Sequence, residues 1–221
     1  MSHATPADPA RSTTPGRVYL DNGGRAPWHP LARQAFEQSL ADGWADPRRL
    51  HAEGRRAARL LDAAREAIAA VLGARTQEVH LTPGHTASLH AAVTSAAAAR
   101  RRAGSAVVVG AVERAACSTA ARLAGSGAAG TGSAAGSGGT GEAPGPVPVD
   151  RFGRVDAEAM ADAVRAPGVA LAALQHANGE VGTLQPVEAV HDAARAAGVP
   201  LLVDAGAVSY THLTLPTILL V

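Results

Sequence analysis

The feature that most constrains the fold is a regular alternation of short apolar runs with stretches of helical periodicity. Residues 169–174 and 201–203 are continuously apolar, which is typical of parallel strands that are buried on both faces. Helical patterns separate such runs, as in residues 187–197. The chain is therefore predicted to be an α/β protein with a mostly parallel sheet and helices on both faces.

The predicted elements follow one another along almost the whole chain, over one domain at residues 17–208. Further short strands are expected at residues 18–21, 79–81, 106–109 and 147–149. Further helices are expected at residues 30–41, after Pro47 as far as residue 72, and at residues 86–102, 113–123 and 157–164.

Composition and charge exclude several classes of partner. The 221 residues carry a formal net charge of +1, which provides no general attraction to nucleic acid or to acidic surfaces. No apolar run approaches the roughly 20 residues that span a bilayer, so no membrane partner is expected. Residues 1–16 lack the order of a secretory signal and are interpreted as a disordered tail, which makes a cytoplasmic location the default expectation. The single cysteine, Cys117, excludes an internal disulfide and a cysteine-built metal site, and no metal site is predicted.

Two segments differ from the rest in composition. Residues 125–145 are almost entirely Gly, Ala, Ser and Thr, which predicts a flexible loop without a function of its own. Residues 209–221 contain no Ala, Gly or Arg, although these residue types dominate the preceding sequence. They form either a natural strand, since they are rich in β-forming residues, or a non-native tail. We favour the tail, because residues 208–217 also resemble the translation of a sequencing adapter.

The first polar loop opens the predicted helix at residues 86–102. Gly84 lets a ligand approach the backbone, and Thr86 adds a hydroxyl donor beside His85. Free N–H groups at a helix start favour an anion such as phosphate. An ordinary helix cap explains the same residues, so the motif alone is weak evidence.

Two further polar segments follow the most apolar strands. Asn178 lies in a glycine-rich loop that is either a structural turn or a loop facing a cofactor. Asp204 follows residues 201–203, where a carboxylate either caps the next turn or pairs with a ligand. Each of the three polar segments follows a predicted strand, at residues 79–81, 169–174 and 201–203. Because the carboxyl ends of parallel strands meet at one edge of a sheet, we expect all three to lie together.

These segments resemble the cysteine desulfurases, within the class V aminotransferase group of fold-type I enzymes that use pyridoxal 5'-phosphate (PLP). The resemblance covers residues 18–208 and rests on the order and spacing of five motifs rather than on any one of them. The motifs lie at residues 18–27, 46–54, 81–86, 178–186 and 203–205.

The resemblance implies PLP as the cofactor and a large domain of the PLP-dependent transferase fold that is incomplete here. Gly84, His85 and Thr86 would hold the PLP phosphate. Asp204 would pair with the ring nitrogen and keep it protonated, so that the ring acts as an electron sink. Asn178 lies in the loop that approaches the ring.

Four positions depart from the family pattern. Arg114 stands where the family has a histidine that stacks on the ring, and it cannot exchange protons near neutral pH. Gly179 occupies the position of the contacting asparagine, and Ala207 that of a glutamine that bonds the ring oxygen. Asp46 replaces the usual asparagine. These departures leave room for an altered substrate or rate.

The amine that this chemistry needs is missing, because all 20 residues counted as Lys or Arg are arginines. In the family, the Schiff-base lysine and the persulfide-carrying cysteine both follow the acidic strand. Cys117 is no substitute, since it lies on a predicted helix among alanines, where a buried structural thiol is the common state. We therefore assign no catalytic residue and expect the chain as given to be inactive.

The expected function is that of an N-terminal fragment of a PLP-dependent cysteine desulfurase-like enzyme. The parent would transfer sulfur from L-cysteine, or act on a related amino acid, and leave alanine. The resemblance also implies a homodimer and a sulfur-acceptor protein as partners. Two alternatives remain: another class V enzyme, such as a selenocysteine lyase, aminotransferase or epimerase, and a non-catalytic binding remnant of the fold.

Overall fold

The computed structural model describes residues 18, 27–126, 145–208 and 219–220. It divides into two compact units, Met1–His80 and Leu81–Val221, and each is described here by itself. The expected tail at residues 1–16 lies outside the described residues, as do most of the strand at 18–21, most of the loop at 125–145 and most of the tail at 209–221.

The first unit contains two helices and one short helical turn. They are α1 (Pro30–Asp42), α2 (Ala52–Leu72) and the 3-10 turn η1 (Thr76–Glu78). The proline at the start of α1 and the left-handed Gly73 after α2, with φ of 65°, mark the boundaries that the sequence predicts. His51 caps α2, because its ring nitrogen accepts a hydrogen bond from the Gly54 N–H.

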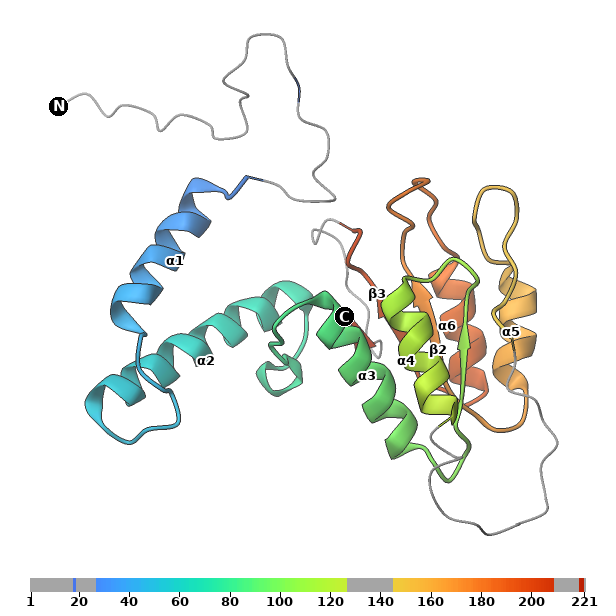
Figure 1. Cartoon of the computed structure of the whole chain (residues 1–221), viewed down its shortest axis with the longest axis horizontal. Coiled ribbons are helices and arrows are strands. Elements are labelled where there is room, and N and C mark those ends of the chain that lie inside the picture. The colour runs from blue at the N-terminus through green and yellow to red at the C-terminus, as the bar shows by residue number, and fades with distance from the viewer. Residues whose placement is uncertain (1–17, 19–26, 127–144, 209–218, 221) are drawn as a thin grey trace. The chain divides into compact units, whose positions relative to one another are not determined.

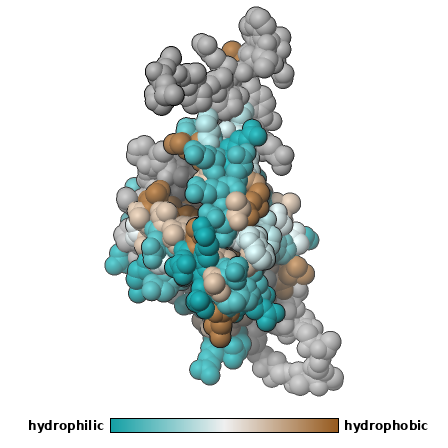
Figure 2. All heavy atoms as spheres, turned by 90° about the vertical axis from the view of Figure 1, so that its left-hand side faces the viewer, coloured by the Kyte–Doolittle hydropathy of each residue, from teal (hydrophilic) through white to brown (hydrophobic). Residues whose placement is uncertain are grey.

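The two long helices of this unit leave much apolar surface in solvent. None of the residues of α1 is buried, and Leu31, Phe36 and Leu40 are all exposed. Hydrophobic residues accordingly lie among hydrophilic ones on the face in Figure 2. No helix among the described residues is both long enough and apolar enough to cross a membrane.

The second unit is a parallel sheet flanked by helices, as predicted (Figure 1). The strands lie in the order β1-β2-β3-β4, and every neighbouring pair is parallel. They are β1 (Ala106–Val109), β2 (Val169–Gln175), β3 (Leu201–Asp204) and β4 (Leu219–Leu220). The helices are α3 (His85–Ala99), α4 (Ala115–Ser126), α5 (Ala157–Arg165) and α6 (Val187–Ala196). The predicted fold class is therefore confirmed.

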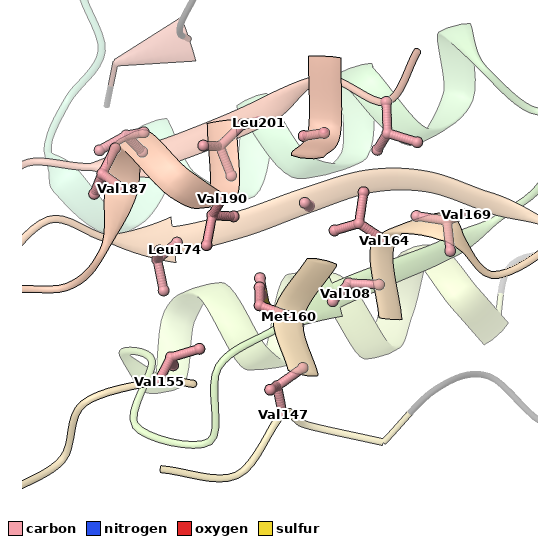
Figure 3. Packing of buried hydrophobic residues seen from close by; sticks show 14 residues of the cluster. Val108, Val147, Val155, Met160, Val164, Val169, Leu174, Val187, Val190 and Leu201 are labelled. Carbon is pink, nitrogen blue, oxygen red and sulfur yellow. The ribbon is translucent and has the colours of Figure 1, made fainter. Parts of the chain in front are cut away.

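Alternate residues of β1 and β3, and of most of β2, enter two separate clusters, one on each face of the sheet. On β2, Leu174 packs on the face covered by α5 and α6, with Met160 and Val190 (Figure 3). Leu171 packs on the opposite face, which α3 and α4 cover, beside Leu89. All seven residues of β2 are buried, which explains its continuous apolar run.

Two of the predicted strands are wrong. Residues 79–81 form no strand, because no described strand lies beside them to complete a ladder, and Leu81 is half-exposed. Residues 147–149 make only single bridges, to Gly110 and to Val155. Segments this short form a strand only when a partner strand is present, which the local sequence does not reveal.

Candidate cofactor-binding site

Three neighbouring strands bring polar groups to one edge of the sheet, at their carboxyl ends. Glu113 and Arg114 lie in the turn after β1, His176 follows β2, and Asp204 ends β3. The strands are in register here, since the His176 N–H donates to the Asp204 carbonyl at 2.8 Å. The predicted meeting of the loops after β2 and β3 is therefore correct.

Asp204 is the buried centre of this edge, with 2% of its surface exposed. Its Oδ1 lies 2.7 Å from His85 Nε2 and accepts the Gly206 N–H at 2.9 Å. Because an ionised carboxylate can only accept hydrogen bonds, His85 Nε2 is the donor. The side chain of His85, predicted to help hold a phosphate, thus contacts the carboxylate, while its backbone N–H remains in the first turn of α3.

The other oxygen of Asp204 has no hydrogen bond within the described part of the chain. Arg114 Nε lies 3.3 Å from this Oδ2, which is ion-pair distance, but the two groups do not have hydrogen-bond geometry. The Arg114 side chain is 45% exposed, so it lies at the rim of the site rather than inside it. A buried carboxylate oxygen without a donor is costly, and it fits a donor brought by a ligand.

The start of α3, whose first residue is His85, lies beside Asp204 and is open to solvent. Gly84 precedes the helix in an extended conformation, with no side-chain cap on the first N–H groups. A Cβ built on Gly84 would meet nothing within 4 Å, so the packing of the chain does not require glycine here. Gly84 and Thr86 are both exposed. The N–H groups predicted to bind an anion are therefore accessible, and they begin a helix of 15 residues.

The loop after β2 is closed by its own hydrogen bonds. Asn178 Oδ1 accepts the N–H groups of Glu180 and Val181, at 2.9 and 3.2 Å. The loop thus contains the structural turn that was one of the two alternatives for Asn178. A contact of Asn178 with a cofactor stays a prediction. A Cβ built on Gly179 would lie 3.6 Å from the Ala207 Cβ. Gly179 and Ala207, two of the four positions that depart from the family pattern, are thus neighbours. Neither offers a polar side chain.

Glu113 is a buried acid that sequence reasoning did not assign to the site. Its Oε1 accepts the Gln175 N–H at 2.9 Å, and its Oε2 has no hydrogen bond among the described residues. Burial raises the pKa of Glu113 to about 8, and the nearby charge of Asp204 adds to this effect. The protonated acid joins the turn after β1 to the end of β2 without adding a second negative charge beside Asp204.

Glu113 should make the stability of the chain fall as pH rises. Between its ordinary pKa of 4.5 and the folded value of about 8, the folded state keeps a proton that the unfolded state has released. Each pH unit in this window therefore costs at most about 1.4 kcal/mol of unfolding free energy. We expect Glu113→Gln to remove this dependence of the unfolding free energy on pH, as measured by urea denaturation at several pH values between 5 and 9. Equal slopes in the two proteins would show that Glu113 is ionised in the folded state.

Gly206 is the second residue that sequence reasoning missed. A Cβ at this position would lie 2.8 Å from Cε1 and from Nε2 of His85, closer than real Cβ atoms come. The glycine two residues after Asp204 thereby leaves room for the imidazole. The only sequence signal is a glycine just beyond a strand end, which also fits an ordinary turn.

Cys117 is buried, with 1% of its surface exposed, as the sequence predicted. Burial raises the pKa of its thiol to about 12, and the charges of Glu113 and Asp204 act in the same direction. A thiol with such a pKa is protonated at neutral pH and is a poor nucleophile.

The chain matches one family along nearly its whole length. The model of the class-V aminotransferases aligns with residues 18–215. The chain belongs to this family. A cysteine desulfurase of Cereibacter sphaeroides is 36% identical over 194 residues, which is 86% of this chain and 46% of the relative. The class-V chain thus spans about half the length of the curated relatives it matches.

Two further comparisons place the class-V chain within its family. A solved structure of a NifS-like protein superimposes with a TM-score of 0.72 at 25% identity, over 86% of this chain and 49% of that one. Human selenocysteine lyase is 32% identical over 72 residues, which is 33% of this chain and 16% of the relative. The NifS-like structure agrees with the parallel sheet and flanking helices described above.

Proposed function

We propose that this chain forms the PLP-binding part of a cysteine desulfurase-like enzyme. The observation that carries the proposal is the buried carboxylate of Asp204, whose Oδ2 has no hydrogen bond from the described residues and which lies beside the open start of α3. These features fit the cofactor at both ends, because PLP carries a phosphate that needs N–H donors and a ring nitrogen that donates to a carboxylate.

Each residue of the site has a role in holding this group. The N–H groups at Gly84, His85 and Thr86 would bind the phosphate, and Asp204 Oδ2 would hold a proton at the ring nitrogen. When bound, the cofactor supplies an electron sink for charge that develops at the substrate α-carbon. Arg114, at the rim, would attract the carboxylate of an amino-acid substrate such as L-cysteine. The buried Glu113 keeps the turn that carries Arg114 fixed to β2.

The full reaction needs a lysine side-chain amine, and none of the 221 residues is a lysine. Transfer of sulfur from L-cysteine to an acceptor protein, with alanine as the second product, therefore belongs to a protein that also carries a lysine. From the family resemblance we also propose that this protein acts as a homodimer in the cytoplasm.

The experiment is a titration of the chain with PLP, followed by dialysis, borohydride reduction and incubation with L-cysteine. We expect a saturable absorbance change that dialysis reverses, no covalent attachment on reduction, and neither alanine nor sulfide, because the chain has no lysine. A band that survives dialysis and disappears on reduction would contradict the predicted inactivity. Absence of any saturable binding would contradict the proposed site.

A second candidate is a selenocysteine lyase, which the similarity to the human enzyme favours. Gly179 and Ala207 leave room for this candidate, since neither supplies the polar side chain that the desulfurase pattern has at its position. An experiment distinguishes the desulfurase from the lyase. The source locus is sequenced across the codon for Val208, and its full open reading frame is expressed and assayed. Turnover of selenocysteine but not of L-cysteine would favour the lyase.

A further inference from the structure

We propose that His85 is a positioning residue that holds the Asp204 carboxylate by one oxygen, so that the other meets the ring nitrogen of PLP. The inference rests on the proposed function and assigns to the His85 side chain a role on the ring side of the cofactor. It comes from the structure alone, since the sequence places His85 within the phosphate motif.

The two oxygens of Asp204 have different surroundings. Oδ1 receives two donors from within the chain, His85 Nε2 at 2.7 Å and the Gly206 N–H at 2.9 Å. Oδ2 receives no hydrogen bond among the described residues, although it is equally buried. Two donors from different segments fix the orientation of the carboxylate, so Oδ2, which lies 3.3 Å from Arg114 Nε without hydrogen-bond geometry, has one direction available to it.

The contact between His85 and Asp204 links segments that are 119 residues apart in the chain. His85 is the first residue of α3, and Leu89, one turn later, packs in the same cluster as Leu202 of β3. Packing of the helix on the sheet therefore sets the position of the imidazole relative to the carboxylate.

Gly206 makes this contact possible. Its missing Cβ would lie 2.8 Å from the imidazole, so any side chain there must displace His85 from Asp204. His85 itself is one-third exposed, so it has room to move away when pushed. Gly206→Ala is thus expected to break the His85–Asp204 hydrogen bond mainly by displacing the imidazole, and its Cβ would also lie 3.1 Å from Asp204 Oδ1.

The test is a double-mutant cycle of His85→Ala and Gly206→Ala, with PLP and pyridoxal as probes in fluorescence titrations. Each single variant should weaken binding about tenfold, and by the same factor for both probes, because a hydrogen bond to a charged group is lost at the ring end. The double variant should bind about as weakly as His85→Ala, since the imidazole that the methyl group displaces is then absent and the 3.1 Å contact with Asp204 Oδ1 remains. Urea denaturation of every variant controls for folding.

A spectroscopic measurement separates positioning from a merely structural role. With PLP labelled with 15N at the ring, we expect the chemical shift to move toward that of an unprotonated nitrogen in His85→Ala. This measurement also decides the question if Gly206→Ala does not fold. An unchanged shift would overturn the inference, as would additive losses in the cycle. A loss for PLP without a loss for pyridoxal would instead place the imidazole on the phosphate. Failure of the unmodified chain to bind either probe would overturn the proposed function itself.

Discussion

Asp204→Asn is expected to weaken PLP binding about 100-fold, because removal of one partner from a buried charge pair costs about 2–5 kcal/mol. The substitution keeps the shape of the side chain, and its remaining carbonyl oxygen can still accept from His85 and Gly206. It removes the charge that favours a protonated ring nitrogen. The measurement is the dissociation constant of PLP from a fluorescence titration.

A matched control comes from an aspartate outside the site. Asp162 pairs with Arg165 at 2.9 Å on α5, and its side chain is 72% exposed. Asp162→Asn should leave the affinity for PLP unchanged, since exposed ion pairs contribute little and α5 covers the face of the sheet opposite α3. If both variants bound PLP as tightly as the unmodified chain, Asp204 would be a capping residue of the turn, which the sequence left as its alternative.

Gly104→Ala should cost about 3–5 kcal/mol of unfolding free energy, a large part of the total for a domain of this size. A Cβ at this position would lie 1.8 Å from the Gly168 carbonyl oxygen, so the backbone itself must shift. That same carbonyl accepts the Ala106 N–H at 3.1 Å, where the pairing of β1 with β2 begins. Urea denaturation measures the loss.

The opposite glycine provides the control for this prediction. Gly104 and Gly168 both have a positive φ, of 156° and 82°, but a Cβ at Gly168 would meet nothing within 4 Å. Gly168→Ala should therefore cost only the backbone strain, about 1–2 kcal/mol. Equal losses in the two variants would show that backbone strain rather than the clash dominates at Gly104.

Much of the fold follows from local patterns. The continuous apolar run of β2 predicted a strand buried on both faces, because no polar side chain interrupts it. The helix start at Pro30 and the helix end at Gly73 follow from the backbone preferences of proline and glycine. Residues 79–81 show the limit of this reasoning, since their alternation of apolar and polar side chains fits a strand but no described strand lies beside them.

The site was only partly predictable for the same reason. Asp204 was assigned from its place after an apolar strand, and the structure locates it at the carboxyl edge as expected. Glu113 was not assigned, because its burial depends on a hydrogen bond to Gln175, 62 residues away. Gly206 was not assigned either, since its importance depends on the imidazole that occupies the space beside it.

The sequence by itself determined the α/β class, the family and the lack of any lysine, because these depend on residue types, order and spacing. Only the tertiary structure decided what the side chain of His85 does. Its backbone belongs to the start of α3, where the sequence indicated an anion cradle, yet its ring bonds a carboxylate 119 residues further along the chain. The packing of α3 against β3 creates this pairing, and no local pattern encodes a contact between segments that meet only when the sheet is covered.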